Sequence, residues 1–135
     1  MSYPEYGLTF EKYQEQATKT AIYPGQRSAL GLAYTALKLN GEAGEFAEHV
    51  GKAIRDDRLI EAQLINHNGS GGTEMRLLTE ERRASLIKEI GDVLWYLSAA
   101  CNELGVTLSD AALVNLEKLR DRASRNALRG SGDNR

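Results

Sequence analysis

"ALGLAYTALKLNGEAGEFAEHVGKAIRDDR", residues 29–58, is the stretch that decides the fold class. An α-helix has 3.6 residues per turn, so apolar side chains spaced three or four apart gather on one face. Such side chains recur through the whole stretch, at Leu32, Ala36, Leu39, Ala43, Phe46, Val50 and Ile54. The pattern predicts one long amphipathic helix from about residue 29 to residue 58.

Three further helices are predicted around this one. In "TFEKYQEQATKTA", residues 9–21, Phe10 and Tyr13 share a face, and Thr9 is a suitable N-cap. A third helix is expected from about residue 79 to residue 104. Its apolar stripe comprises Leu86, Ile90, Val93, Leu94, Leu97 and Cys101.

The end of the third helix and the start of a fourth are marked by local signals. Gly105 is a suitable C-terminal cap, and "TLSD", residues 107–110, resembles a capping box that opens a helix to about residue 126. No segment alternates in the manner of a strand. The sequence therefore predicts an all-α fold of the four-helix-bundle type.

Length and composition restrict the classes of function. The chain has 135 residues, of which 41% are hydrophobic and 27% charged, and its formal net charge is −2. This balance is ordinary for a globular domain and gives no basic surface for nucleic acid. No apolar run approaches the roughly 20 residues needed to span a bilayer. A single cysteine, no apparent secretion signal and no membrane segment lead us to expect a cytoplasmic protein.

One domain is expected over residues 1–128. The segment "NHNGSGGTE", residues 66–74, has the composition of a loop because its small polar side chains cannot form a core. The final residues, 129–135, are expected to be a disordered tail.

Two pairs of acids carry the candidate chemistry. Glu42 and Glu45 lie three residues apart on the long helix, and Glu89 and Asp92 have the same spacing on the third helix. Residues three apart share a helical face, so four carboxylates converge if the two helices pack side by side. A glycine precedes the second acid of each pair, and we expect these glycines to let the helices approach closely.

Four converging carboxylates need positive charge to remain ionised, and a bound metal would supply it. All-oxygen ligation suits Mg²⁺, with Mn²⁺ as a substitute. Zinc would require His or Cys, and a di-iron bundle would require Glu-x-x-His, which is absent around His49. The alternative is that these acids form a solvated face, as most single Glu-x-x-Glu pairs do. The residues alone leave both interpretations open.

A second polar group is predicted on the fourth helix. Asn115, Lys118 and Arg122 fall at positions i, i+3 and i+7, a set of side chains able to hold a polyanion. Lys52 is a weaker candidate on the face of Glu42. A solvated basic face is the alternative, but metal-binding acids together with phosphate-binding cations are typical of phosphoryl transfer or hydrolysis.

These residues resemble the MazG-like nucleoside triphosphate pyrophosphohydrolases, an all-α family. The family pattern Glu-x-x-Glu followed by Glu-x-x-Asp is matched by Glu42, Glu45, Glu89 and Asp92. The contexts "LKLNGEAGEFAEHVGKAIR", "LIKEIGDVLWYLSAACNELGVTL" and "NLEKLRDR" are also similar, and the start of the chain resembles short, phage-type members. The resemblance runs from about residue 8 to residue 122. The spacer between the acid pairs is longer than usual, which predicts an inserted loop at about residues 60–80.

The resemblance implies hydrolysis of a nucleoside triphosphate to the monophosphate and pyrophosphate. Two or more Mg²⁺ ions would be held by the four acids, and Asn115, Lys118 and Arg122 would bind phosphate. Lys38 and Tyr96 are weaker candidates for nucleotide binding. We expect a member that adjusts the nucleotide pool, with a purine deoxynucleotide such as dGTP as the preferred substrate.

The resemblance also implies a homo-oligomer, a dimer or tetramer, in the host cytoplasm if the protein is phage-encoded. Several apolar side chains would need cover from the rest of the chain or from another copy: Leu30, Leu37, Leu59, Ile60 and Leu64. The alternative to an enzyme is a non-catalytic helical module that binds a nucleotide or a protein partner.

Overall fold

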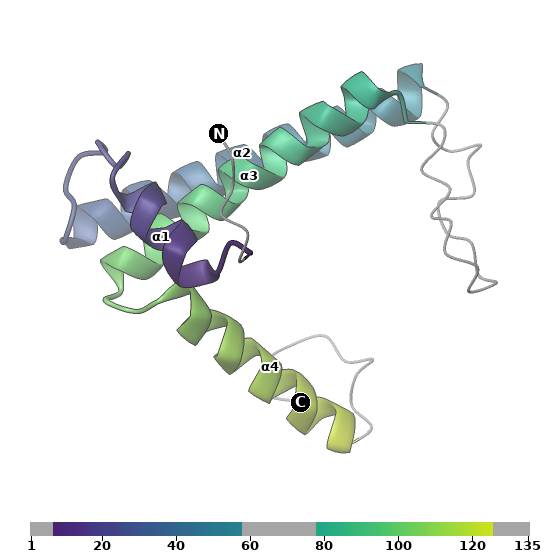
Figure 1. Ribbon diagram of the computed structural model, residues 1–135. Coiled ribbons are helices and arrows are strands. Elements are labelled where there is room, and N and C mark those ends of the chain that lie inside the picture. Colours follow the sequence, from purple (N-terminus) through teal and green to yellow (C-terminus); the bar gives the residue numbers. More distant parts are fainter. Residues whose placement is uncertain (1–6, 58–77, 126–135) are drawn as a thin grey trace. The chain divides into compact units, whose positions relative to one another are not determined.

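The fold is that of a computed structural model, which describes residues 7–57 and 78–125. These residues form helices and no strand, so the all-α prediction is confirmed (Figure 1). The helices are α1 (Phe10–Thr18), α2 (Ala29–Asp56), α3 (Glu80–Glu103) and α4 (Leu108–Ser124). The tail at 129–135 and nearly all of the insertion predicted at 60–80 lie outside the described residues.

Helix ends follow the capping chemistry that the sequence predicts. The Thr9 side chain accepts a hydrogen bond from the backbone N–H of Lys12, 3.3 Å away, which fixes the start of α1. Thr107 and Asp110 form a complete capping box at the start of α4. Gly105 has φ +70°, the left-handed conformation that a glycine C-cap supplies. The first helix is shorter than predicted, since α1 ends at Thr18.

The chain divides into two compact units. The first unit holds Met1–Leu32 and Leu97–Arg135, and the second unit holds Ala33–Tyr96.

In the second unit, α2 and α3 run side by side (Figure 1). Their shared core contains the buried side chains of Ala53, Leu78 and Leu86, with Phe46 and Val50 packed against them. Phe46 and Val50 belong to the predicted apolar stripe of α2. Removal of this apolar surface from water is the main stabilisation that the helix pair gains.

Polar contacts fix the antiparallel register of the pair. Arg82, near the start of α3, bonds through Nε to Oδ2 of Asp57, just after α2, at 2.8 Å. Further along α3, Lys38 of α2 lies over the ring of Tyr96, with Nζ 5.7 Å from the ring centre. The end of α2 therefore lies beside the start of α3.

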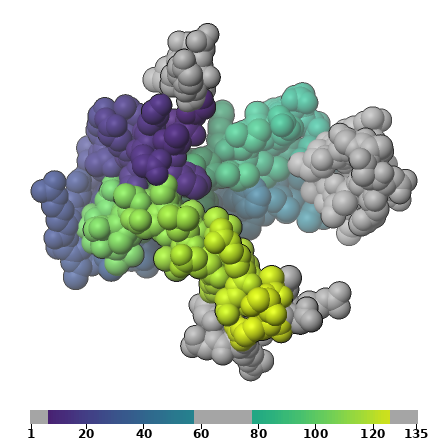
Figure 2. Space-filling view, turned by 60° about the horizontal axis from the view of Figure 1, so that its bottom comes forward, coloured from purple at the N-terminus to yellow at the C-terminus, as the bar shows by residue number. Residues whose placement is uncertain are grey.

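In the first unit, Gln14 of α1 ties α1 to the turn between α3 and α4. Its Nε2 donates to Oδ1 of Asn102 at 2.7 Å, and its Oε1 accepts from the backbone N–H of Leu108 at 2.8 Å. The Asn102 amide in turn donates to Oγ1 of Thr18 at 2.8 Å. Figure 2 shows α1, in purple, against the green segment that begins α4.

Within the same unit, Glu103 holds the loop between α1 and α2 in place by hydrogen bonds. Its carboxylate accepts a hydrogen bond from the hydroxyl of buried Tyr23, and another from the backbone N–H of Arg27 at 2.7 Å. Arg27 has φ +61°, a strained conformation for a residue with a side chain. A Cβ added to Gly31 would lie 2.4 Å from the carbonyl oxygen of Gly25 and 2.7 Å from Oε2 of Glu103, so only glycine fits at position 31.

The predicted apolar stripes are buried only in part. Ile54, Ile90 and Leu97 were assigned to the stripes, but they are 44%, 53% and 40% exposed. Leu30 and Leu37 are 60% and 75% exposed, whereas Leu59, Ile60 and Leu64 lie outside the described residues. Two helices cannot cover every side of each other, so part of each predicted stripe stays exposed in the single chain.

None of the helices in the described ranges combines the length and the apolar character needed to cross a membrane.

Candidate functional site

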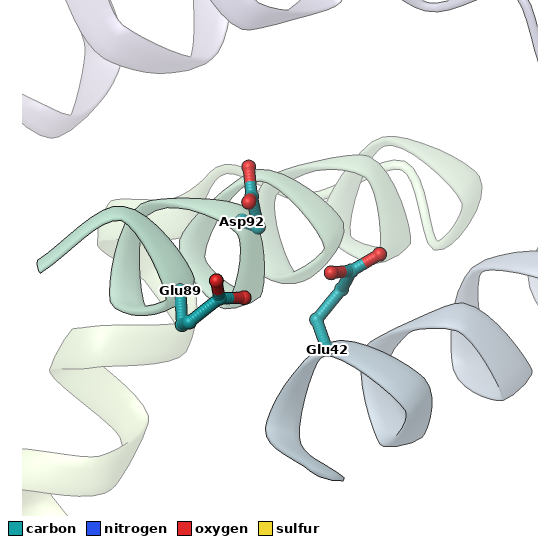
Figure 3. A group of neighbouring side chains, drawn as sticks. All are labelled: Glu42, Glu89 and Asp92. Carbon is teal, nitrogen blue, oxygen red and sulfur yellow. The ribbon is translucent and has the colours of Figure 1, made fainter. Parts of the chain in front are cut away.

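Three carboxylates of the second unit converge between α2 and α3. Glu42 projects from α2 toward α3, which carries Glu89 and Asp92 one turn apart (Figure 3). Each residue offers one oxygen atom, and these atoms all lie within 4.8 Å of one another. Glu42 and Glu89 are half-buried, whereas Asp92 is exposed, so the group is open to solvent on one side.

Apolar side chains close to the acids in sequence explain why the acids converge. Phe46 follows Glu42 by four residues and packs against the shared core, while buried Leu86 precedes Glu89 by three. Residues three or four apart lie on the same side of a helix. The core that joins α2 to α3 therefore also brings Glu42 toward Glu89.

Lys38 lies beside the acidic group. Its Nζ is 3.3 Å from Oε1 of Glu42, one turn away on α2. The hydrogen bond to Glu42 is the main cause that raises the pKa of Lys38, and Tyr96 adds to it. Burial raises the pKa of Tyr96. Lys38 and Tyr96, predicted as weaker nucleotide-binding residues, thus form one cluster next to the acids.

His49 of α2 contacts one acid of the group, Glu89 of α3. Its Nε2 lies 3.5 Å from Oε1 of Glu89, and its Nδ1 is buried with no hydrogen-bond partner in the described residues. No role at the site was predicted for His49 from the sequence. The seven-residue spacing from Glu42, two helical turns, was the signal that could have linked it to the site.

Other predicted residues of α2 lie outside the three-acid group. Glu45 is exposed and is not one of the acids that converge. Lys52 is held by Glu48, with Nζ 2.6 Å from Oε1. That ion pair is the main cause that lowers the pKa of Glu48. The metal-binding role of Glu45 and the phosphate-binding role of Lys52 stay predictions.

The glycines do not have the role that the sequence predicted. A Cβ added at Gly44 or Gly91 would meet nothing within 4 Å in the described part of the chain, and the same holds at Gly41. The expectation that Gly44 and Gly91 permit a close helix approach is therefore wrong for this pair of helices. Open space, rather than a neighbouring backbone, adjoins these glycines.

The predicted phosphate-binding residues lie on α4, in the first unit. Asn115 is exposed, and Lys118 and Arg122 are half-buried. Their spacing of three and four residues places them along one side of the helix. Their role toward a phosphate stays a prediction.

The chemistry of the three-acid group fits a hard divalent cation. Two unit charges 4.8 Å apart repel by about 1 kcal/mol in water, and by several kcal/mol at the effective dielectric constant of a protein surface. A single nearby lysine, Lys38, does not balance three carboxylates. Oxygen ligands from two helices suit Mg²⁺ or Mn²⁺, so Glu42, Glu89 and Asp92 are the residues able to hold such an ion.

Comparison with known proteins identifies the class. The model of the MazG nucleotide pyrophosphohydrolase domain matches residues 32–126, which include all three converging acids and the polar side of α4. The chain therefore belongs to the MazG nucleotide pyrophosphohydrolase family. It is 40% identical over 126 residues to the Gene 37 protein of Mycobacterium phage L5, with 91% of this chain and 96% of that protein covered. No solved structure matches the chain.

Proposed function

We propose that this protein is a Mg²⁺-dependent nucleoside triphosphate pyrophosphohydrolase. It would use water to break the α–β phosphoanhydride, giving a nucleoside monophosphate and pyrophosphate. The observation that carries the proposal is the convergence of Glu42, Glu89 and Asp92 in a chain of the nucleotide pyrophosphohydrolase family.

The acids serve as the ligand set in this proposal. Glu42, Glu89 and Asp92 hold the metal, and Glu45 is retained as a fourth ligand because it completes the family motif. Two or more Mg²⁺ ions, with Mn²⁺ as a substitute, would neutralise the triphosphate and make water a better nucleophile.

The predicted polar residues of both units are assigned to the substrate. Asn115, Lys118 and Arg122 would bind phosphate oxygens, because amide and cationic donors compensate the charge of the triphosphate. Lys38 and Tyr96 are weaker candidates for contact with the base or sugar of the nucleotide. Their position next to Glu42 supports this assignment. Lys52 is a further cation on α2.

The active form is proposed to be a homo-oligomer, a dimer or tetramer. Large apolar side chains are exposed along α4, and a chain that keeps them in water forgoes the hydrophobic stabilisation that their burial gives. Those on α4 are Leu113, Val114, Leu116 and Leu119, which are 54%, 65%, 47% and 40% exposed. Contact with a second copy would remove them from water.

The substrate is proposed to be a deoxynucleoside triphosphate of the host cell's pool, with a purine such as dGTP preferred. The basis is the likeness to a phage protein and the aromatic ring of Tyr96 next to the acids.

A product analysis tests the proposal. The purified protein is incubated with Mg²⁺ and each common ribo- and deoxynucleoside triphosphate, and products are resolved by phosphorus NMR. We expect monophosphate and pyrophosphate, with no turnover after chelation of the metal. Diphosphate and orthophosphate would show that another bond is cleaved. No turnover of any nucleotide would favour a non-catalytic binding module.

A further inference from the structure

We propose that His49 is a positioning residue for Glu89, holding its carboxylate in place for the metal centre. The inference rests on the proposed function and deepens it, since His49 lies outside the four acids of the family motif. His49 acts through Glu89 and touches neither metal nor substrate.

The geometry places His49 between the helices. It lies on α2, seven residues after Glu42, so the two side chains share a face two turns apart. Its Nε2 is 3.5 Å from Oε1 of Glu89 on α3. One face of α2 thus supplies both a candidate ligand, Glu42, and a contact to the candidate ligand of the neighbouring helix.

The surroundings of the ring decide which nitrogen carries the proton of the neutral imidazole. Nδ1 of His49 is buried without a partner in the described residues, and a proton there would be an unsatisfied buried donor. The other tautomer directs an N–H at the Glu89 carboxylate. The 3.5 Å separation needs to shorten by roughly 0.5 Å to reach an ordinary hydrogen-bond length.

Glu89 needs such a contact because its neighbours repel it. Glu42 and Asp92 each place an oxygen within 4.8 Å, so like charges push the Glu89 carboxylate away from the position where the three acids converge. Lys38 restrains Glu42 at 3.3 Å, and His49 supplies the corresponding contact for Glu89. Carboxylates that bind metals are commonly held by such outer hydrogen bonds, and losing one lowers metal affinity.

Two variants separate the hydrogen bond from simple packing. His49→Gln keeps a side-chain N–H near the position of Nε2, whereas His49→Leu keeps bulk but has no donor. Mn²⁺ affinity is measured by electron paramagnetic resonance on nucleotide-free protein, and folding by circular dichroism. We expect His49→Leu to bind Mn²⁺ roughly 10- to 100-fold more weakly, and His49→Gln to recover most of that loss. Glu15→Gln, which alters an exposed ion pair of α1, is the control and should bind as the wild type does.

The outcomes distinguish this inference from the proposed function. Wild-type Mn²⁺ affinity in a folded His49→Leu protein would overturn the role of His49 and leave the proposed function standing. An equal loss in both variants, or nitrogen coupling that shows His49 bound to Mn²⁺, would overturn the hydrogen-bond role. Absence of Mn²⁺ binding by the wild type would contradict the metal centre itself. If His49→Leu does not fold, His49→Ala replaces it.

Discussion

The carboxylate of Glu103 in the first unit and the three-acid group of the second unit differ in how their charge is compensated. Glu103 accepts hydrogen bonds from the Tyr23 hydroxyl and the Arg27 backbone N–H. Glu42, Glu89 and Asp92 instead place oxygens within 4.8 Å of one another.

This difference separates a structural carboxylate from a functional one. Hydrogen-bond donors compensate the charge of the Glu103 carboxylate, and these bonds hold the loop between α1 and α2. A structural role in the folded chain is therefore sufficient to explain Glu103. The three-acid group costs electrostatic free energy in the isolated chain, and a bound cation would reverse that cost. Glu103 is therefore expected to matter for stability, and the three acids for metal binding and turnover.

The largest expected effect is on turnover. Glu42→Gln and Asp92→Asn should each lower kcat/KM by roughly 1,000-fold, because metal-ion stabilisation contributes several kcal/mol to the transition state. The free energy of unfolding of the metal-free protein should not fall, and should rise where the lost charge relieves the repulsion among the three acids. Steady-state kinetics and denaturant titration measure the two quantities.

Glu15→Gln is a matched control for Glu42→Gln. Glu15 pairs with Lys19 at 3.3 Å and a spacing of four residues, the same distance and spacing as Glu42 with Lys38. The Glu15→Gln variant should leave turnover unchanged. Near-normal kcat/KM in Glu42→Gln, or a matching loss in Glu15→Gln, would contradict the special status of the three-acid group.

Removal of the structural carboxylate should act on stability. Glu103→Ala deprives Tyr23 and Arg27 of their acceptor, and we expect a loss of about 2–4 kcal/mol in the free energy of unfolding. Mn²⁺ affinity of the folded protein should not change. Denaturant titration and Mn²⁺ binding test this pair of outcomes, and a stable Glu103→Ala protein that fails to bind Mn²⁺ would reverse the assignment.

Glycine substitutions sharpen the comparison between the units. Gly31→Ala introduces a Cβ 2.4 Å from the Gly25 carbonyl oxygen and should cost about 1–3 kcal/mol. Gly44→Ala meets nothing within 4 Å in the described residues and should stabilise the chain by up to about 1 kcal/mol through helix propensity. Thermal unfolding of both variants provides the measurement. A Gly44→Ala protein less stable than the wild type would mean that its open space is filled by another copy.

A further effect is expected only at alkaline pH. Burial, followed by the hydrogen bond to Glu103, raises the pKa of Tyr23 to about 12. The unfolded chain has a tyrosine pKa of about 10, so the stabilisation is complete below pH 10 and is lost as pH rises toward 12. Melting temperatures from pH 8 to pH 12 should therefore fall more steeply for the wild type than for Tyr23→Phe. Equal slopes would contradict the raised pKa.

The helices were predictable because their signals are local. Thr9, the Thr107–Asp110 box and Gly105 act within one turn of a helix end, so a short stretch of sequence contains the whole interaction. The acid spacing on α3 is equally local, which is why Glu89 and Asp92 were correctly expected on one face.

Features that depend on both helices together were harder to predict. Whether Glu45 joins Glu42 depends on how α2 is rotated against α3, and periodicity defines that rotation only roughly. The exposure of Ile90 and the open space at Gly44 depend on which residues pack against these positions. The spacing of apolar residues along one helix does not specify those packing partners. His49 and Glu89 are 40 positions apart in the sequence, and no sequence motif predicts the contact between them.

Anomalous diffraction from crystals grown with Mn²⁺ tests the central claim most directly. We expect a Mn²⁺ peak bonded to Glu42, Glu89 and Asp92, with oxygen distances of about 2.0–2.3 Å, near those that Mg²⁺ takes. Crystals grown with Mn²⁺ that show no peak at these three carboxylates, or a peak only at other acids of the chain, would contradict the assignment of this metal site.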